Sequence, residues 1–144
     1  AAEKGHLAVV ALLLDQGAEV NASGRHLDQA LHLASFEGHK LVVSLLLSRH
    51  ADLEAQSARF GSSLRAAAMG GHEPIVELLI KKGADISAQD GRKESALHAA
   101  VERGNAKMVN LLLDNGADIK ARGYCGNALH IAAAGGHEQL LQQL

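Results

Sequence analysis

The chain has 144 residues, a length typical of a single domain with its own hydrophobic core. Hydrophobic residues make up 47% of it but aromatic residues only 2%, so the core must be built from small aliphatic side chains, which favour closely stacked helices. The formal net charge of −2 gives no reason to expect nucleic acid as a partner. No apolar run approaches the roughly 18 residues of a membrane span, so we expect no contact with a membrane.

The chain contains a single cysteine, Cys125, which cannot form an intrachain disulfide. This favours a reducing compartment, so we expect an intracellular protein, either cytoplasmic or nuclear.

A period of 33 residues runs through the sequence. The phrases GAEVNA, HADLEA, GADISA and GADIKA start at Gly17, His50, Gly83 and Gly116. The phrases ALH, SLR, ALH and ALH start at Ala30, Ser63, Ala96 and Ala128. The last arrives one residue early, because one residue is missing after Gly116. A recurrence of this kind predicts a repeat protein.

The repeating units divide the chain into one domain of five parts. A partial unit at residues 1–23 is followed by full units at 24–56, 57–89 and 90–122, and by a partial unit at 123–144. Each unit predicts two short helices and a loop. The array begins and ends inside a unit, with no obvious polar cap, so we expect a piece of a longer array or poorly ordered ends.

The helices are predicted from their caps and their apolar spacing. In the second full unit, Pro74 lies in the first turn of the second helix, where a missing amide hydrogen costs little. In the third full unit, Ser95 and Asn105 are good N-caps, and Gly104 and Gly116 can end the helices in the left-handed conformation. The loop that follows, GADIKARGYCGN, is expected to be extended or a hairpin.

One helix pair of this size cannot bury its own apolar stripe. The pairs must stack on their neighbours, which predicts an all-α solenoid. Leucines of the stripe, such as Leu46, Leu79 and Leu112, are expected in the core, where replacement by alanine costs about 2–5 kcal/mol.

The phrases that recur every 33 residues resemble the ankyrin repeat. Its pattern contains a Thr-Pro-Leu-His start, a Gly-His turn and a Gly-Ala-Asp loop. The resemblance covers essentially the whole chain. The phrase GNALHIAAAGGHE is also similar to the arrays common in fungal multi-repeat proteins, often attached to a nucleotide-binding signalling domain. The family implies antiparallel helix pairs with β-hairpin loops, called fingers, that project at about a right angle. It also implies protein binding along the fingertips and the concave face of the first helices, without catalysis or a cofactor.

The sequence departs from the family pattern at several positions. The proline of the Thr-Pro pair is absent from every unit, although Ser62, Ser95 and Asn127 are still suitable caps. Arg65 replaces the motif histidine, so the second full unit contains either a local weak point or a binding position. His50 replaces a glycine after a helix, where a residue with a Cβ is strained at positive φ.

The residues that look reactive are explained by the repeat. Seven histidines fall on repeat positions: His6, His32, His39, His72, His98, His130 and His137. We expect them to tie helix starts to neighbouring loops, because equivalent histidines of stacked units lie roughly 8–10 Å apart, too far to share a metal ion. We therefore predict no metal site.

A catalytic site is also not expected. Cys125 lies in a predicted finger and His130 begins a helix, and the sequence supplies neither an orienting group nor an oxyanion hole. Glycine-rich pieces such as AMGGHEP lack the Lys-Ser/Thr of a phosphate loop and follow a helix, not a strand. The chain is thus predicted not to be an enzyme and to bind no cofactor.

The residues that differ from one repeating unit to the next are candidates for partner binding. Those in the fingers are Arg25, His26, Asp28, Arg59, Phe60, Arg92, Lys93, Glu94, Arg122 and Tyr124. Those at the exposed ends of the first helices are Phe36, Glu37, Met69, Glu102 and Arg103. Stacking would align Arg25, Arg59, Arg92 and Arg122 in a basic ridge. Both phenylalanines and the tyrosine belong to this set, and none is expected in the core.

We expect a non-enzymatic module that binds an acidic protein partner through this surface, since arginine and aromatic residues are enriched at protein interfaces. The charged fingertips could instead be solvated loops. A second hypothesis is a sensor or regulatory segment of a larger signalling protein. Nucleic acid could also contact the basic ridge, but the net negative charge and the scarcity of aromatic residues argue against it.

Overall fold

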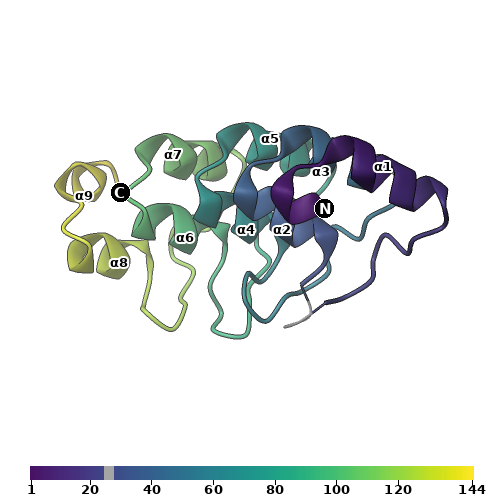
Figure 1. Ribbon diagram of the computed structural model, residues 1–144. Coiled ribbons are helices and arrows are strands. Elements are labelled where there is room, and N and C mark those ends of the chain that lie inside the picture. The colour runs from purple at the N-terminus through teal and green to yellow at the C-terminus, as the bar shows by residue number, and fades with distance from the viewer. Residues whose placement is uncertain (25–27) are drawn as a thin grey trace.

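The computed structural model describes residues 1–24 and 28–144, which form helices stacked in a row (Figure 1). The bounds in chain order are a 3-10 helix η1 (Ala2–Lys4), then α1 (Leu7–Asp15), α2 (Ala30–Glu37), α3 (Lys40–Ser48), α4 (Ser63–Gly70), α5 (Glu73–Lys81), α6 (Ala96–Glu102), α7 (Ala106–Asp114), α8 (Ala128–Ala134) and α9 (Glu138–Gln143). No helix among the described residues is long and apolar enough to cross a membrane.

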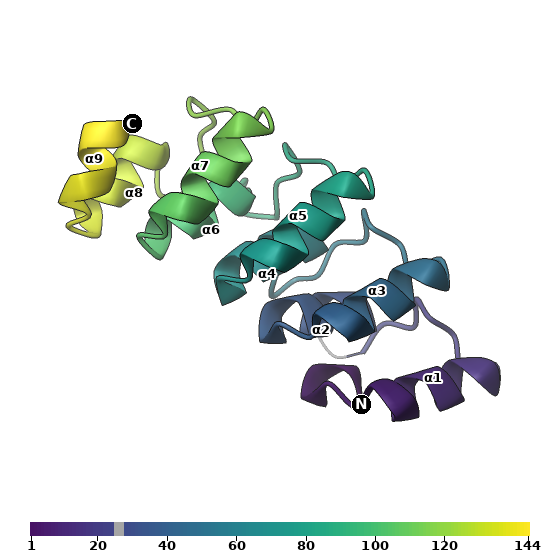
Figure 2. The ribbon, with the colours of Figure 1, turned by 90° about the horizontal axis from the view of Figure 1, so that it is seen from above.

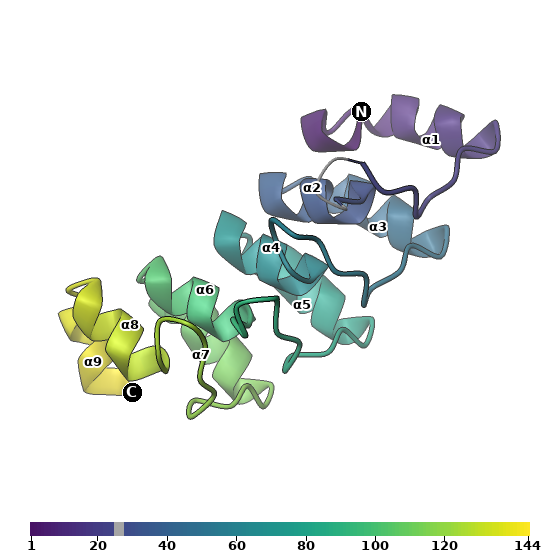
Figure 3. The same ribbon diagram turned by 90° about the horizontal axis from the view of Figure 1, so that it is seen from below.

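The helices form two layers. The first helices of the units, α2, α4, α6 and α8, pack on one another in chain order, and α1, α3, α5 and α7 do the same in the second layer. Each first helix also packs on the second helix of its own unit. Views from above and below show the pairs following one another from the N-terminus to the C-terminus (Figures 2 and 3). The predicted all-α solenoid of stacked helix pairs is confirmed.

The helix ends agree with the caps expected from the sequence. Asn105 accepts a hydrogen bond from the N–H of Met108, and Pro74 lies in the first turn of α5. Gly104 has φ 67° and Gly116 has φ 93°, both left-handed. His50 also has a positive φ, 63°, as its place in the glycine register predicted.

Long loops connect the helix pairs and extend on the side of the first helices (Figure 1). These fingers comprise residues 49–62, 82–95 and 115–127. In the described residues they contain no named strand, only two isolated antiparallel bridges, Ser57 with Gly61 and Gly123 with Gly126. The predicted hairpins are therefore tight turns. One isolated bridge closes each of the fingers at 49–62 and 115–127, and a hydrogen bond from the N–H of Asp90 to the carbonyl of Glu94 closes the finger at 82–95.

An aspartate after the His-Ala or Gly-Ala pair organises the start of each of these three fingers. The carboxylates of Asp52, Asp85 and Asp118 accept hydrogen bonds from the backbone N–H two residues later, at 3.0, 2.8 and 2.8 Å. Neighbouring fingers are also joined, because Glu54 Oε1 accepts a bond of 3.1 Å from the N–H of Asp85. The aspartate of this phrase thus specifies a turn that recurs in the three fingers.

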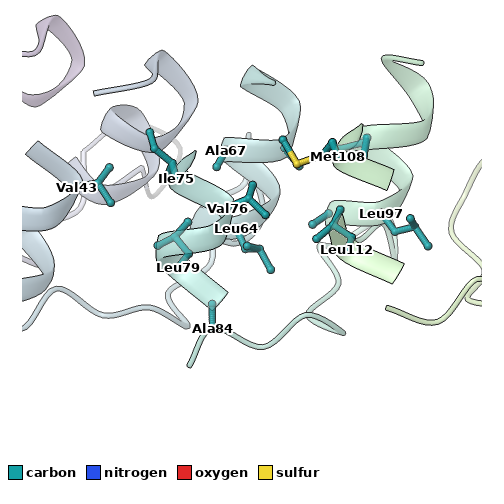
Figure 4. Packing of buried hydrophobic residues seen from close by; sticks show 14 of the residues in the cluster. Val43, Leu64, Ala67, Ile75, Val76, Leu79, Ala84, Leu97, Met108 and Leu112 are labelled. Atoms are coloured by element: carbon teal, nitrogen blue, oxygen red, sulfur yellow. The ribbon is translucent and has the colours of Figure 1, made fainter. Parts of the chain in front are cut away.

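The core runs continuously along the stack between the two layers. Figure 4 shows Leu64 and Ala67 of α4 beside Ile75, Val76 and Leu79 of α5. Leu46, Leu79 and Leu112 are all buried, as predicted. Alanines fill the buried side of the first helices, which allows these helices to approach closely.

One core residue was not expected. Phe60 is only 1% exposed, although the sequence suggested a finger position on the surface and a core without aromatic residues. The Ser57–Gly61 bridge turns the finger back on itself, and Ser57 Oγ accepts a hydrogen bond from the N–H of Phe60 at 2.9 Å. This turn directs the Phe60 ring inward, so the prediction of an exposed side chain was wrong.

Candidate functional site

Two histidines of the ALH phrase join helix starts to fingers. His32 and His98 accept hydrogen bonds at Nδ1 from the N–H groups of Gln29 and Ser95, at 3.2 and 3.1 Å. Their Nε2 atoms lie 2.9 and 3.2 Å from finger carbonyl oxygens, those of Ala55 and Ala121. Because Nδ1 accepts, the ring proton is on Nε2, and each neutral ring donates to a finger.

Burial lowers the pKa of His32, although the Ala55 carbonyl and nearby aspartates act in the opposite direction. In the unfolded chain the ring regains its ordinary pKa, near 6.5. As the pH falls below that value, the unfolded chain therefore binds a proton that the folded chain does not, and the stability contributed by a neutral His32 is lost.

Three histidines of the Gly-His phrase each link their unit to the one before it. The Nε2 atoms of His39, His72 and His137 lie 3.0, 2.9 and 3.0 Å from the carbonyl oxygens of Glu3, Phe36 and Glu102. The prediction that the motif histidines serve the scaffold is confirmed for these three and for the two histidines that reach the fingers.

A hydrogen bond from Arg103 takes the place of one of these histidine links. Asn105 stands where a Gly-His histidine would stand, and Nη1 of Arg103 donates instead to the carbonyl of Met69 at 2.7 Å. Arg103 is exposed, as predicted for a binding residue, but it also has this structural contact. The signal that could have revealed this contact is the GN phrase at Gly104, which lacks the expected histidine.

Arg65 is the centre of a buried ionic network. Its residue is 6% exposed, and its Nη2 lies 2.9 Å from Glu94 Oε2 while its Nη1 lies 3.5 Å from Asp90 Oδ2. Nη1 also donates to the carbonyl of Phe60 at 3.1 Å. Arg65 is therefore not accessible as a binding position, the second of the two alternatives, because its guanidinium is buried with its counter-ions inside the stack.

Glu94 is one of those counter-ions. The sequence placed it among the exposed finger residues, but it is buried. A carboxylate on the finger after α5 can reach the cation on α4 because the fingers and the first helices meet at this point. The prediction of an exposed Glu94 was wrong for this reason.

Arg59 lies over the two phenylalanines. Its guanidinium carbon is 4.5 Å from the centre of the Phe60 ring and 5.8 Å from that of Phe36. The two ring centres are 4.9 Å apart, with a tilt of 36°. Phe36 comes from the end of α2 and is half-buried, whereas Arg59 is exposed. The contact therefore joins a finger to the first helix of the preceding unit.

The last two fingers carry an exposed basic and aromatic surface. Arg92, Lys93 and Arg122 are exposed, and Tyr124 is 83% exposed. The N–H of Tyr124 donates to the carbonyl of Arg92 at 2.9 Å, which joins the two fingers at their tips. Lys93 has a positive φ of 59° that is held by a bond from its N–H to the carbonyl of Asp90.

Cys125 lies at a cavity of about 260 Å³ between α6 and α8. The cavity is lined by Glu94, His98, Glu102, Cys125, Ile131, Ala134 and Gly135. The thiol is exposed, and its pKa is raised by desolvation and by the nearby carboxylates of Glu94 and Glu102. A raised pKa keeps the thiol protonated, which disfavours the nucleophilic thiolate that covalent catalysis requires.

Metal ligands do not gather in the part of the chain that the structure describes, where no group of three His, Cys, Asp or Glu side chains is placed to hold an ion. His130 bonds with Asn127 at the start of its own helix, and the His137 ring reaches the carbonyl of Glu102. Cys125, His130 and His137 thus have separate surroundings. The absence of a catalytic role and of a cofactor stays a prediction.

The structure divides the predicted binding residues by exposure. Exposed are Glu37, Arg59, Arg92, Lys93, Glu102, Arg103, Arg122 and Tyr124. Half-buried are Asp28, Phe36 and Met69, and buried are Phe60 and Glu94. Arg25 and His26 lie outside the described residues, so the basic ridge can be followed only from Arg59 to Arg122.

The stacked helix pairs and the hydrogen bonds that recur between units place the chain in the class of helical repeat proteins. A family model described as "Ankyrin repeats (3 copies)" matches residues 1–57 and 63–144. The chain belongs to the ankyrin repeat family. A comparison with curated proteins found no match. Ankyrin repeats generally serve as protein–protein interaction modules and are typically not enzymes.

Proposed function

We propose that this chain binds a protein partner along the surface formed by the fingers and the first helices, here called the finger face, and that the partner presents acidic side chains. The observation that carries the proposal is the set of exposed arginines on successive fingers, Arg59, Arg92 and Arg122, with Tyr124 beside the last of them.

The chemistry of this surface supports binding in preference to a purely solvated role. Tyrosine and arginine are the residue types that contribute most binding energy at protein interfaces. Tyr124 is held at its backbone by the neighbouring finger, so it can add contact area at a low cost in chain ordering. Like charges on successive fingers give a positive field that attracts an acidic segment and speeds its association.

The test starts from peptides selected for binding to this chain from a displayed library of short random sequences. The double variant R59E/R92E should weaken binding of the selected peptides by about tenfold or more and reduce its salt dependence, because repulsion replaces attraction. Fluorescence anisotropy of labelled peptides over a range of salt concentrations measures both effects.

The matched control is K40E/K107E, which makes the same change in net charge at two exposed lysines in the first turns of α3 and α7. Glutamate is favourable at a helix N-terminus, so this variant should remain folded and bind as the parent does. Unchanged affinity and salt dependence in R59E/R92E would contradict the proposed function.

A further inference from the structure

The Arg59 side chain starts from a fixed piece of backbone. The turn from Ser57 to Gly61 is closed by two backbone hydrogen bonds of 2.9 Å. Ser57 Oγ accepts bonds from the N–H groups of Arg59 and Phe60, at 3.0 and 2.9 Å, and donates to the carboxylate of Asp28. The Arg59 backbone is therefore held by its own finger and by the segment before α2.

The guanidinium is also held, by the phenylalanine pair. Phe60 is buried and cannot move without disturbing the stack, and its ring centre lies 4.5 Å from Cζ of Arg59. Phe36 lies on the other unit, at 5.8 Å. A guanidinium over aromatic rings is attracted through its flat face, which leaves the N–H donors along its edge available.

The charge of Arg59 is not neutralised by the residues that the structure describes. The ion pairs formed by arginines among residues 1–24 and 28–144 are those of Arg49 with Asp15 and of Arg65 with Asp90 and Glu94. Two carboxylates of this region are engaged elsewhere, since Asp28 accepts from Ser57 and Glu94 pairs with Arg65. Arg59 is thus an oriented cation on the finger face without a counter-ion there.

We propose that Arg59, stacked on Phe36 and Phe60, is a carboxylate-binding subsite that receives one aspartate or glutamate side chain of the bound partner. This inference rests on the proposed function and names the contact that orients the partner. A planar guanidinium binds a carboxylate through two parallel hydrogen bonds, a geometry that lysine cannot supply. A single guanidinium suits a monoanion, whereas phosphate recognition usually draws on several cationic or backbone donors.

The test separates the geometry of Arg59 from its charge. In the peptide assay, R59K should weaken binding by about tenfold although the positive charge is kept, because the flat stacking face and the paired donors are lost. The control R92K should change binding by no more than about twofold, since Arg92 makes no such stack with an aromatic ring in the described residues. F36L should weaken binding several-fold, with Arg59 itself unchanged.

A double-mutant cycle identifies the peptide group. Each acidic residue of a selected peptide is replaced in turn by its amide and measured against the parent chain and R59Q. One replacement should be costly with Arg59 and nearly neutral with R59Q, which shows that the two groups interact. Thermal unfolding checks that each variant is folded, and R59K and R59Q should be, because Arg59 is exposed.

The outcomes distinguish the two proposals. If R59E/R92E weakens binding while R59K and F36L do not, the carboxylate subsite is refuted and the proposed function stands. Coupling of Arg59 to no acidic residue, or preferential binding of the same peptides in phosphorylated form, would also overturn the subsite. If R59E/R92E has no effect, the proposed function itself fails.

Discussion

Hydrogen bonds from single histidines connect most of the units, and they depend on glycines that leave room for the rings. A Cβ built on Gly38 would lie 2.5 Å from Cε1 of His72, whose Nε2 reaches the carbonyl of Phe36 at 2.9 Å. Gly38 also has φ 87°, in the left-handed region. The Gly-His phrase therefore encodes a backbone turn and a contact between units together.

Replacing Gly38 with alanine should destabilise the chain more than the same change at Gly83. Gly83 has a similar φ, 95°, but open space around it, so G83A should cost only the backbone strain, about 1–2 kcal/mol. G38A should lose at least about 1 kcal/mol more, because the His72 ring must move and its hydrogen bond weakens. Urea unfolding of the two variants measures the difference, and equal losses would contradict a role for the ring contact.

At the scale of elements, the joint between α4 and the next finger differs from the other joints. Where His32 and His98 donate to a finger carbonyl, Arg65 of α4 forms ion pairs with Asp90 and Glu94 on the finger after α5. Removing one charge from a buried network leaves the opposite charges without a partner. The resulting loss of unfolding free energy is larger than the stability that the intact network contributes.

The variant R65M should therefore be destabilised by about 3 kcal/mol, since two largely buried carboxylates lose their cation. Neutralising those carboxylates in R65M/D90N/E94Q should recover more than half of the loss. The midpoint of chemical unfolding checks this prediction. A triple variant no more stable than R65M would show that Arg65 stabilises the chain through packing, not through charge.

The whole molecule is a row in which each pair of helices contacts its neighbours. The helix contacts among the described residues run between neighbouring units, so stability depends on the interfaces between successive units. Leu79 lies at the centre of this row, fully buried between the layers (Figure 4). A cavity at that point weakens α5 and the interfaces on both sides of it.

The variant L79A should lose about 2–5 kcal/mol of unfolding free energy, because alanine leaves an unfilled space in the core. The control L41A, at a leucine that is 69% exposed, should change stability by no more than about 0.5 kcal/mol. Circular dichroism during urea unfolding measures both variants. A loss in L79A as small as that in L41A would show that the stack does not depend on this interface.

The fold was predictable because the residues that specify it recur at a fixed period along the sequence. Ser95, Asn105 and Gly104 act in the local ways that their positions in the repeat indicate, and the buried leucines follow helical spacing. The candidate site was predictable only in part. Arg92 and Tyr124 lie on exposed fingers as expected, whereas Phe60 and Glu94 are buried, because they depart from the repeat and their surroundings come from other units.

The sequence by itself determined the helix pairs, their order and the places where they turn, since caps, glycines and apolar spacing act within a few residues. Only the tertiary structure decided which charges are used inside the stack and which remain on its surface. Arg65 and Arg59 are six residues apart, yet the first is enclosed by carboxylates from the next finger and the second lies over phenylalanines on the finger face. Burial and counter-ions supplied by neighbouring units set that difference, and a linear sequence does not display them.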